Sequence, residues 1–481
     1  MPSKPTARTT IDVPSELAPL LRAILEHAED FKTEARAGRP NFAKAEEDLG
    51  SLVARAEAAM LGDMLASMDP ATERVTVEGD TYRRLEQPAR AQYTGLRGEM
   101  LVQRGLYRKE GLRNGPTIVP MELVAGIVEG RYTPGAARLA AALAQEMPSR
   151  SADVVCRSAG VLPHSRAAQQ RVGLELGKRW EALGPDAERA LVREMEIPPE
   201  VVAASVAVDR ISLPMAEPRV PTAEDRARGV KSPIDVNYRM SFVAALTLYD
   251  AEGDPLTTIR YAHVAEGGAA AMEASLRGDL ETLHQRRPDV KLLTLGDGAA
   301  EMQGILDRAT ASLPVAARVV DVWHLVEHLG HGIGATGRFV EDLLADWKDA
   351  LLSRDGAIEE IETQLREWER EYAKEACPPG LHAALTYIVN HRERLRYATL
   401  RTARLPIGSG TVEATGKAIV TVRMKRPGAR WVPVGAQAIM SLRALATSGS
   451  GRWDAAILRV LDAYRVPVRP TNQRRVRTHK R

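Results

Sequence analysis

Hydrophobic residues recur at helical spacing through the first part of the chain. Apolar side chains lie three or four positions apart within 13–36 and again within 41–67, and Gly38, Arg39 and Pro40 interrupt the pattern. An apolar stripe of this period is typical of an amphipathic helix, and Gly and Pro end one. The sequence therefore predicts a pair of helices within residues 1–70.

The pattern changes twice before residue 200. Residues 72–108 carry short β-like runs broken by glycine, which predicts a small β-hairpin element. Helical spacing then returns, with helices expected over 149–161 and 164–180 around a tight turn at Ala159 and Gly160. This layout is typical of a helix-turn-helix, although any three-helix bundle needs a similar turn. In the DNA-reading interpretation, the side chains that reach base edges are Arg166, Gln169 and Gln170.

Residues 200–446 predict a mixed sheet with helices packed on it. An apolar strand is expected to end at Asp209, and strands over 240–250 and 254–264 form a hairpin around a Glu-Gly turn. Helices and strands then alternate, which gives the fold class α/β (α+β). A strongly helical, acidic segment interrupts this domain. The expected divisions are 1–70, 71–199, 200–334, 335–399 for the insertion, 400–446, and 447–481 for a basic tail.

Charge and composition narrow the class of partner. The 481 residues have a net charge of only +3, but 465–481 hold seven Lys or Arg and no acid, which favours a polyanion as partner. Only Cys156 and Cys377 are present, so a disulfide framework or a CxxC zinc site is not expected. No apolar run approaches the ~20 residues of a membrane span, and the first residues lack the apolar core of a signal peptide. We therefore expect a cytoplasmic protein whose partner is nucleic acid.

Three carboxylates occupy positions suited to a metal site. Asp209 and Asp297 are expected at strand ends, where open sheets place their ligands, and Glu413 in the first turn of a helix after a Gly-Ser-Gly turn. Three such carboxylates can hold two divalent ions ~4 Å apart, as in-line phosphoryl displacement requires. Oxygen ligands favour Mg²⁺ or Mn²⁺. The alternative for Asp297 is an ordinary Asp-Gly turn, and for Asp209 a solvated strand-end acid.

A basic stripe follows Glu413. Lys417 lies one helical turn beyond the carboxylate, and the next basic residues have no acid between them before an aromatic ring: Arg423, Lys425, Arg426, Arg430 and then Trp431. This arrangement is suited to a phosphodiester backbone with a ring stacked on a base. The alternative is a solvated helix end, with Trp431 anchoring the helix expected at 434–446.

A rival motif lies at His324, Glu327 and His328. Their spacing matches the HxxEH pattern of inverted zinc peptidases, in which two histidines bind zinc and the glutamate acts as base. No obvious third ligand follows downstream. His324 is therefore also interpreted as a helix-start residue near the carboxylates.

Taken in order, the segments VDRISLPM, LGDGA, VVDVWHLVEHL, LPIGSGTVEATGK and RMKRPGARW resemble the DDE transposases of bacterial insertion sequences. The resemblance is to the Mutator-related group close to the Kra-type insertion sequences and covers about residues 200–446. It implies an RNase H-like catalytic domain with a helical insertion, in which Asp209, Asp297 and Glu413 are the catalytic acids. Asp321 and His324 would form the accessory D-x-x-H element. Many relatives carry Cys pairs before the helix-turn-helix region, whereas 72–115 has none.

The resemblance implies a DNA transposase that uses two Mg²⁺ or Mn²⁺ ions to cleave element ends and join the 3′-hydroxyl to target DNA. A homo-oligomer associated with the nucleoid is the expected form. The alternatives are an inactive or domesticated relative that only binds DNA and, more remotely, the zinc peptidase.

Overall fold

The computed structural model describes residues 13–15, 17–162, 165–372, 376–449 and 451–471. The chain divides into two compact units, one of residues 1–176 and 458–481 and the other of residues 177–457. Of the expected basic tail, 447–481, the last ten residues, 472–481, lie outside the described residues, whereas the described part contains a helix, Arg452–Asp462, and a short strand, Arg469–Pro470, and so is not only a tail. Among those described, no helix is both long and apolar enough to cross a membrane.

The first unit begins with the predicted helical pair. Helices α1 (Ala18–Arg36) and α2 (Phe42–Ser67) pack together, and the Asn41 side chain caps α2 by accepting from the Lys44 N–H at 3.2 Å. The helices start and end close to the expected positions because the apolar stripe and the Gly-Arg-Pro break are both strong local signals.

The β-structure expected at 72–108 is present, but it is more extensive than the single small hairpin predicted, because this region contributes strands to two sheets. Strands β3 and β4 pair with each other, while the other sheet has the order β12-β1-β2-β5-β6. The edge strand β12 comes from the far end of the chain and so could not be found from local sequence. The strands are β1 (Arg74–Val77), β2 (Asp80–Arg84), β3 (Ala89–Thr94), β4 (Glu99–Arg104), β5 (Tyr107–Lys109), β6 (Thr117–Ile118) and β12 (Arg469–Pro470).

Helices complete the first unit and lead into the second. They are α3 (Pro120–Ala125), α4 (Pro134–Glu146), α5 (Ser149–Ser158), α6 (Arg166–Glu194) and α18 (Arg452–Asp462). The Thr133 side chain caps α4 in front of Pro134 by accepting from the Ala136 N–H. Helix α6 is interrupted at Gly184, which adopts φ 71° before Pro185.

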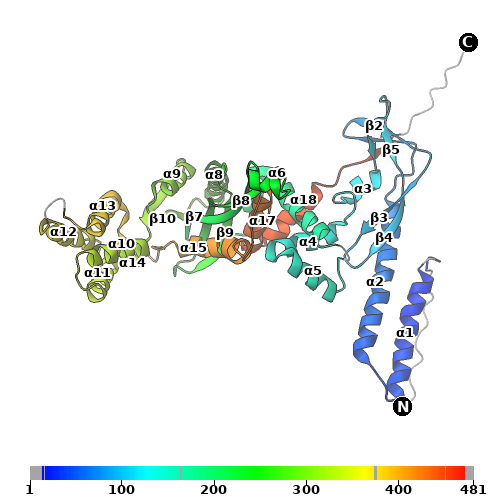
Figure 1. Ribbon diagram of the computed structural model, residues 1–481, viewed down its shortest axis with the longest axis horizontal. Coiled ribbons are helices and arrows are strands. Elements are labelled where there is room, and N and C mark those ends of the chain that lie inside the picture. The colour runs from blue at the N-terminus through cyan, green and yellow to red at the C-terminus, as the bar shows by residue number, and fades with distance from the viewer. Residues whose placement is uncertain (1–12, 16, 163–164, 373–375, 450, 472–481) are drawn as a thin grey trace, which may run out of the picture. The chain divides into compact units, whose positions relative to one another are not determined.

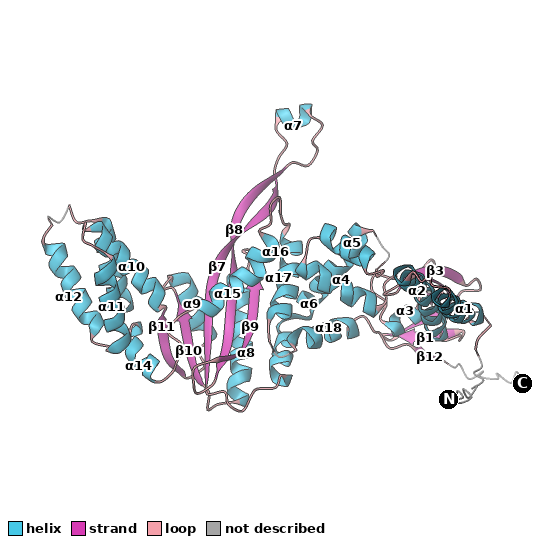
Figure 2. Cartoon of the chain, turned by 90° about the horizontal axis from the view of Figure 1, so that it is seen from below, coloured by secondary structure: helices cyan, strands magenta, loops and turns pink. Residues whose placement is uncertain are grey.

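The second unit is built on a five-stranded mixed sheet (Figure 1), whose strand order β11-β10-β7-β8-β9 can be followed in Figure 2. Strands β7, β8 and β9 form an antiparallel meander, and β10 and β11 continue the sheet in parallel with β7. The mixed α/β class is therefore confirmed. The strands are β7 (Ala203–Pro218), β8 (Ile234–Tyr249), β9 (Pro255–His263), β10 (Lys291–Gly296) and β11 (Val315–Val320).

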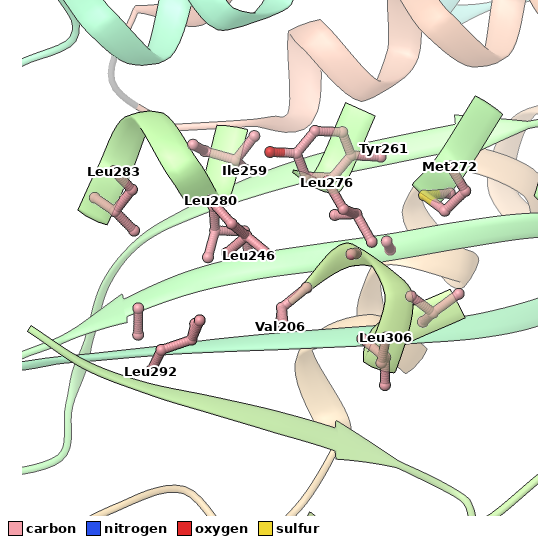
Figure 3. Close-up of a cluster of buried hydrophobic side chains, with 14 of the residues drawn as sticks. Val206, Leu246, Ile259, Tyr261, Met272, Leu276, Leu280, Leu283, Leu292 and Leu306 are labelled. Atoms are coloured by element: carbon pink, nitrogen blue, oxygen red, sulfur yellow. The ribbon is translucent and has the colours of Figure 1, made fainter. Parts of the chain in front are cut away.

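Both faces of the sheet are covered by helices. On one face α8 (Gly268–Arg286) and α9 (Ala300–Ala309) pack over a core that includes Val206, Leu246 and Leu276, all fully buried (Figure 3). On the other face α15 (Gly410–Gly416) lies over β7 and β8, where a Cβ at Gly416 would be in van der Waals contact with Ile211 and Val243. It continues as a π-helical turn, Lys417–Thr421, and α16 (Val422–Met424), and α17 (Pro433–Thr447) packs along β9.

Strand β7 does not end at Asp209, contrary to expectation. It continues for nine residues beyond this position, paired throughout with β8. Because β9 and β10 pair only with the inner halves of these strands, the outer halves form a two-stranded ribbon with the short helix α7 (Ala223–Ala227) at its tip (Figure 2). The predicted strand was too short because polar residues are mixed with apolar ones in the ribbon, so the apolar run ends before the strand does.

The expected helical insertion is present between β11 and α15. Its stacked tryptophans, Trp347 and Trp368, have ring centroids 5.5 Å apart and give it a core of its own. The helices are α10 (Val322–Ala335), α11 (Glu341–Ser353), α12 (Ala357–Arg370), α13 (Pro379–His391), the short turn Arg392–Arg394, and α14 (Tyr397–Thr402).

Candidate active site

Asp209 and Asp297 lie at the same level of two neighbouring parallel strands. The last paired residues of β7 and β10 are Ala207 and Leu295, so each aspartate stands two residues beyond the same rung. Burial raises the pKa of the Asp209 carboxyl above its ordinary value. The Arg210 N–H, 2.6 Å from Oδ1, opposes this shift, and the negative charge of Asp297 adds to it. The two carboxylates are therefore close enough to repel each other.

Glu413 lines the same cleft, although it comes from a helix much later in the chain. It lies in the first turn of α15, as expected, and lines a cleft of about 470 Å³ together with Asp209 and Asp297. Its carboxylate is largely exposed and lies 2.6 Å from Lys417 Nζ, one turn along the helix. The three acids that the sequence proposed thus line one cleft although 88 and 116 residues separate them along the chain (297 − 209 and 413 − 297).

Asp321 connects the strand that precedes it to the loop that carries Glu413. Its buried carboxylate accepts from the Trp323 N–H at 2.7 Å, which caps α10. It also accepts from both the backbone N–H and the hydroxyl of Ser409. Because these bonds use both oxygens, Asp321 fixes the position of the loop, and the structure gives it a positioning role beside the acids.

Two residues that the sequence interpretation missed hold the Asp297 turn in place. The Tyr387 hydroxyl donates to the Asp297 backbone carbonyl at 2.6 Å, and the His391 ring packs edge-on against Tyr387 at 4.7 Å. A Cβ at Gly298, which adopts φ 88°, would come within 2.7 Å of His391 Nε2. Both side chains belong to α13 of the insertion. We call this contact of Tyr387 and His391 with the Asp297 turn the clamp. The Asp-Gly dipeptide indicated the turn, but nothing in the sequence indicates which side chains pack on it.

The carboxylates of the cleft are of the chemical type that binds a divalent metal. All the acidic ligands offered are oxygens, which suits Mg²⁺ or Mn²⁺, and the repulsion between Asp209 and Asp297 is what a cation would relieve. Among the described residues, however, no three His, Cys, Asp or Glu side chains are grouped closely enough to hold an ion. Glu413 would have to exchange Lys417 for the metal before it could become a ligand.

The HxxEH segment does not form a zinc site among the described residues. His324 lines the cleft, and its positive form would lower the pKa of Asp209. His328 is instead stacked on Tyr387 with ring centroids 4.0 Å apart, and burial lowers the pKa of its imidazole. The two histidines therefore lie in different environments, His324 in the cleft and His328 against Tyr387.

The expected basic stripe is only partly exposed. Arg423 is buried, with its guanidinium 5.2 Å from the centre of the Trp431 ring, so its assignment as a DNA contact is wrong. It turns inward because the π-helical turn shifts the helical phase at Lys417–Thr421. Lys425 is half-buried and donates to Ser212 Oγ at 3.0 Å, which leaves Arg426 and Arg430 as the exposed members.

Trp431 is a structural residue rather than an open stacking platform. Its backbone pairs with β7, through bonds to Pro214 O at 3.1 Å and from Ala216 N at 2.8 Å. The ring N–H donates to Met424 O at 3.0 Å. The half-buried ring therefore closes the loop in front of α17, as the alternative interpretation expected.

The helix-turn-helix interpretation loses one of its three residues. Gln169 is buried and donates to the Leu162 carbonyl at 3.1 Å, so it holds the turn together and cannot reach a base. Arg166 and Gln170 are exposed at the start of α6. Gln169 faces inward because it lies in the first helical turn of α6, on the side that packs against the loop containing Leu162.

The comparisons with known proteins give no relative. No protein-family model, characterised protein or solved structure matches the chain. The site is therefore interpreted from its geometry and from the resemblance of its motifs.

Proposed function

We propose that this protein is a DNA transposase that cleaves element ends and joins the 3′-hydroxyl to target DNA with two divalent ions. The observation that carries the proposal is the cleft shared by Asp209, Asp297 and Glu413. The order of these acids along the chain, each in one of the motifs that resemble DDE transposases, supports it. So does the position of the helical insertion between the second and third acid.

We further propose that the second unit is an RNase H-like domain. Three antiparallel strands followed by two that run parallel to β7 support this assignment, with Asp297 just beyond the carboxyl end of β10 and Asp209 level with it on β7. Nucleases and transposases of this class act by in-line displacement, in which a bound metal pair stabilises the attacking and leaving oxygens. Asp209, Asp297 and Glu413 would hold these ions.

The remaining residues of the site position the acids and bind the DNA backbone. Asp321 and Ser409 fix the loop from which Glu413 projects, and Tyr387 fixes the turn of Asp297. Lys417 neutralises Glu413 while no cation is bound to it. Arg426 and Arg430, which are exposed beyond α16, are placed to neutralise phosphates of the bound duplex.

Two alternatives are distinguished by the same experiment. Purified protein is incubated with duplexes taken from the DNA that flanks its gene, in Mg²⁺, in Mn²⁺ and in EDTA. The proposal expects metal-dependent nicks at one position and joined products. Binding without any nick would favour an inactive relative that only binds DNA, and zinc-dependent cleavage of a peptide substrate would favour the peptidase.

A further inference from the structure

The outer half of β8 is a sheet edge that no other strand covers among the described residues. Residues 242–249 pair with β9, but residues 234–241 pair only with β7 in the part of the chain that the structure describes. Every residue from Ile234 to Met240 is exposed. An edge strand of this length presents a row of backbone donors and acceptors that can pair with another strand, and natural proteins usually block such edges with Pro, Lys or a bulge. None of these lies within 234–240.

The exposed edge also carries an apolar stripe. Ile234, Val236, Tyr238 and Met240 alternate along the strand, and Tyr238 is 68% exposed. Alternating residues share one face of a strand. The stripe continues the face on which Phe242 packs in the core, but it extends past the helices that cover that core. A large exposed apolar strip on a projecting ribbon is typical of an interaction surface.

The backbone groups of the apolar positions point outward from the ribbon. Arg219 N–H donates to Pro233 O at 3.1 Å, so the odd-numbered positions of β8 bond to β7. The even-numbered positions therefore direct their N–H and C=O groups to the open edge. A strand that adds here would pair with Ile234, Val236, Tyr238 and Met240.

The charges on this strand are complementary to a second copy of the same strand. In an antiparallel pair centred on Asn237, Asp235 of one copy lies opposite Arg239 of the other, and Val236 lies opposite Tyr238. Outward-facing positions then oppose each other, as the ladder requires. Pairs centred on Asp235 or Arg239 place like charges opposite each other, and pairs centred on Val236 or Tyr238 leave both charges without an opposite partner.

The neighbouring strand extends this complementarity. Arg239 is held by Glu217, at 2.6 and 2.8 Å, and Asp235 is held by Arg219 at 2.9 Å. Pairing the two edges would join these ion pairs into a ladder of alternating sign across the four strands. Arg219 also bonds Asp225, which connects the end of β7 to α7 at the tip.

We propose that two copies of this protein associate through antiparallel pairing of residues 234–240, with Asn237 on the two-fold axis. Such an interface is isologous, because the same patch serves both subunits. The proposal concerns the surface of the ribbon and does not depend on the chemistry of the acidic cleft.

Charge reversal gives a test that includes its own control for folding. Asp235→Arg places Arg opposite Arg, and Arg239→Asp places Asp opposite Asp, so each variant alone is expected to be monomeric by light scattering across a concentration series. An equimolar mixture restores two unlike pairs and is expected to form a heterodimer. Arg228→Asp, a charge reversal at the ribbon tip, should leave the wild-type dimer unchanged.

Cross-linking tests the register. Cysteines from Asn237→Cys would meet across the axis at a position without backbone bonds, where side chains are closest. They are expected to form a disulfide-linked dimer under mild oxidation. Those from Asp235→Cys would be four residues out of register, roughly 13 Å apart, and should not cross-link. A monomeric wild type, a dimer that survives either charge reversal, a mixture that stays monomeric, or equal cross-linking by both cysteines would overturn the proposal.

Discussion

Asp209 and Asp297 stand side by side on neighbouring parallel strands, each two residues past the last pair, Ala207 and Leu295. The charge of Asp297 helps to raise the pKa of Asp209, although burial is the larger cause. Two carboxylates that repel each other in a cleft are costly to maintain unless a cation binds between them. This relationship gives the metal-binding proposal a consequence for stability.

Asp209→Asn should raise the melting temperature of the protein in EDTA at pH 7. The folded pKa of Asp209 lies above its ordinary value of 3.8, so its ionised form destabilises the folded state. The penalty is present above the folded pKa and disappears below the unfolded one, so the gap between variant and wild type should close as the pH falls toward about 4. Thermal melts at several pH values measure it.

Asp289→Asn is the matched control for this experiment. The Arg287 side chain lowers the pKa of Asp289, so this substitution should leave the melting temperature unchanged or slightly lower it. Mg²⁺ should stabilise the wild type more than Asp209→Asn. A melting temperature of Asp209→Asn below that of the wild type in EDTA at pH 7 would contradict the account.

Tyr387→Phe should slow DNA cleavage without preventing folding. The substitution removes the hydroxyl that donates to the Asp297 carbonyl, so the turn that positions the acid loosens. Losing a partner behind a metal ligand costs about 10- to 100-fold in metal affinity or activity, whereas the lost hydrogen bond costs only about 1 kcal/mol of stability. Cleavage rates measured against Mg²⁺ concentration, together with thermal melts, separate the two effects.

Tyr249→Phe provides the comparison, because it removes a hydroxyl contact with Ser205, 3.1 Å away, at the far end of β7 from the cleft. It should alter stability by a similar amount and leave cleavage intact. Equal cleavage by both variants would show that Tyr387 has no role in positioning Asp297.

Arg426→Ala combined with Arg430→Ala should flatten the dependence of DNA affinity on salt. Each phosphate contact contributes about one unit to the slope of log affinity against log salt, so the slope should fall by about two. Sequence preference should hardly change, because phosphate contacts position the duplex without reading it. The measurement is a set of binding curves at several salt concentrations.

The control removes the same charge from the opposite face of the sheet. Arg277 and Arg308 both pair with Glu273 there, and replacing both with Ala should leave the salt slope unchanged. If the Arg426 and Arg430 variant also kept the wild-type slope, those residues would not lie on the DNA path.

Trp431→Ala should lower the free energy of unfolding by about 3 kcal/mol, at the low end for a buried Trp because the ring is only half-buried. The ring packs under Arg423 and donates to Met424 O, so Trp431→Phe should lose about 1 kcal/mol for the hydrogen bond. Urea denaturation measures both. Unchanged stability combined with weakened DNA joining would instead indicate that the ring stacks on a base.

The sequence predicted those parts of the site that depend on local patterns. Asp297 follows an apolar strand, and Glu413 follows a Gly-Ser-Gly turn, so short-range signals placed both correctly. Asp209 was placed at the end of its strand because nothing local shows that β7 continues as a ribbon. Only its pairing with β8, whose partners lie 16 to 32 residues further along the chain (234 − 218 and 242 − 210), reveals this.

Side chains whose orientation depends on how the folded chain packs could not be placed from the sequence. Arg423 was expected on the surface, but the π-helical turn before it rotates its guanidinium inward over the Trp431 ring. Gln169 was expected to face DNA, whereas Leu162 draws it inward. The clamp of Tyr387 on Asp297 joins residues 90 positions apart, and no periodicity records such a contact.

The most direct test of the central claim compares Asp297→Asn with Asp289→Asn in cleavage and binding. Both lose one carboxylate from the neighbourhood of β10, but Asp297 lies at its carboxyl end in the cleft and Asp289 precedes its amino end. In nicking, joining and gel-shift assays on the DNA flanking the gene with Mg²⁺, Asp297→Asn should abolish cleavage and joining while binding DNA nearly as the wild type does, and Asp289→Asn should retain all three. Cleavage by Asp297→Asn at the wild-type rate, or a loss of binding equal to its loss of cleavage, would contradict the account.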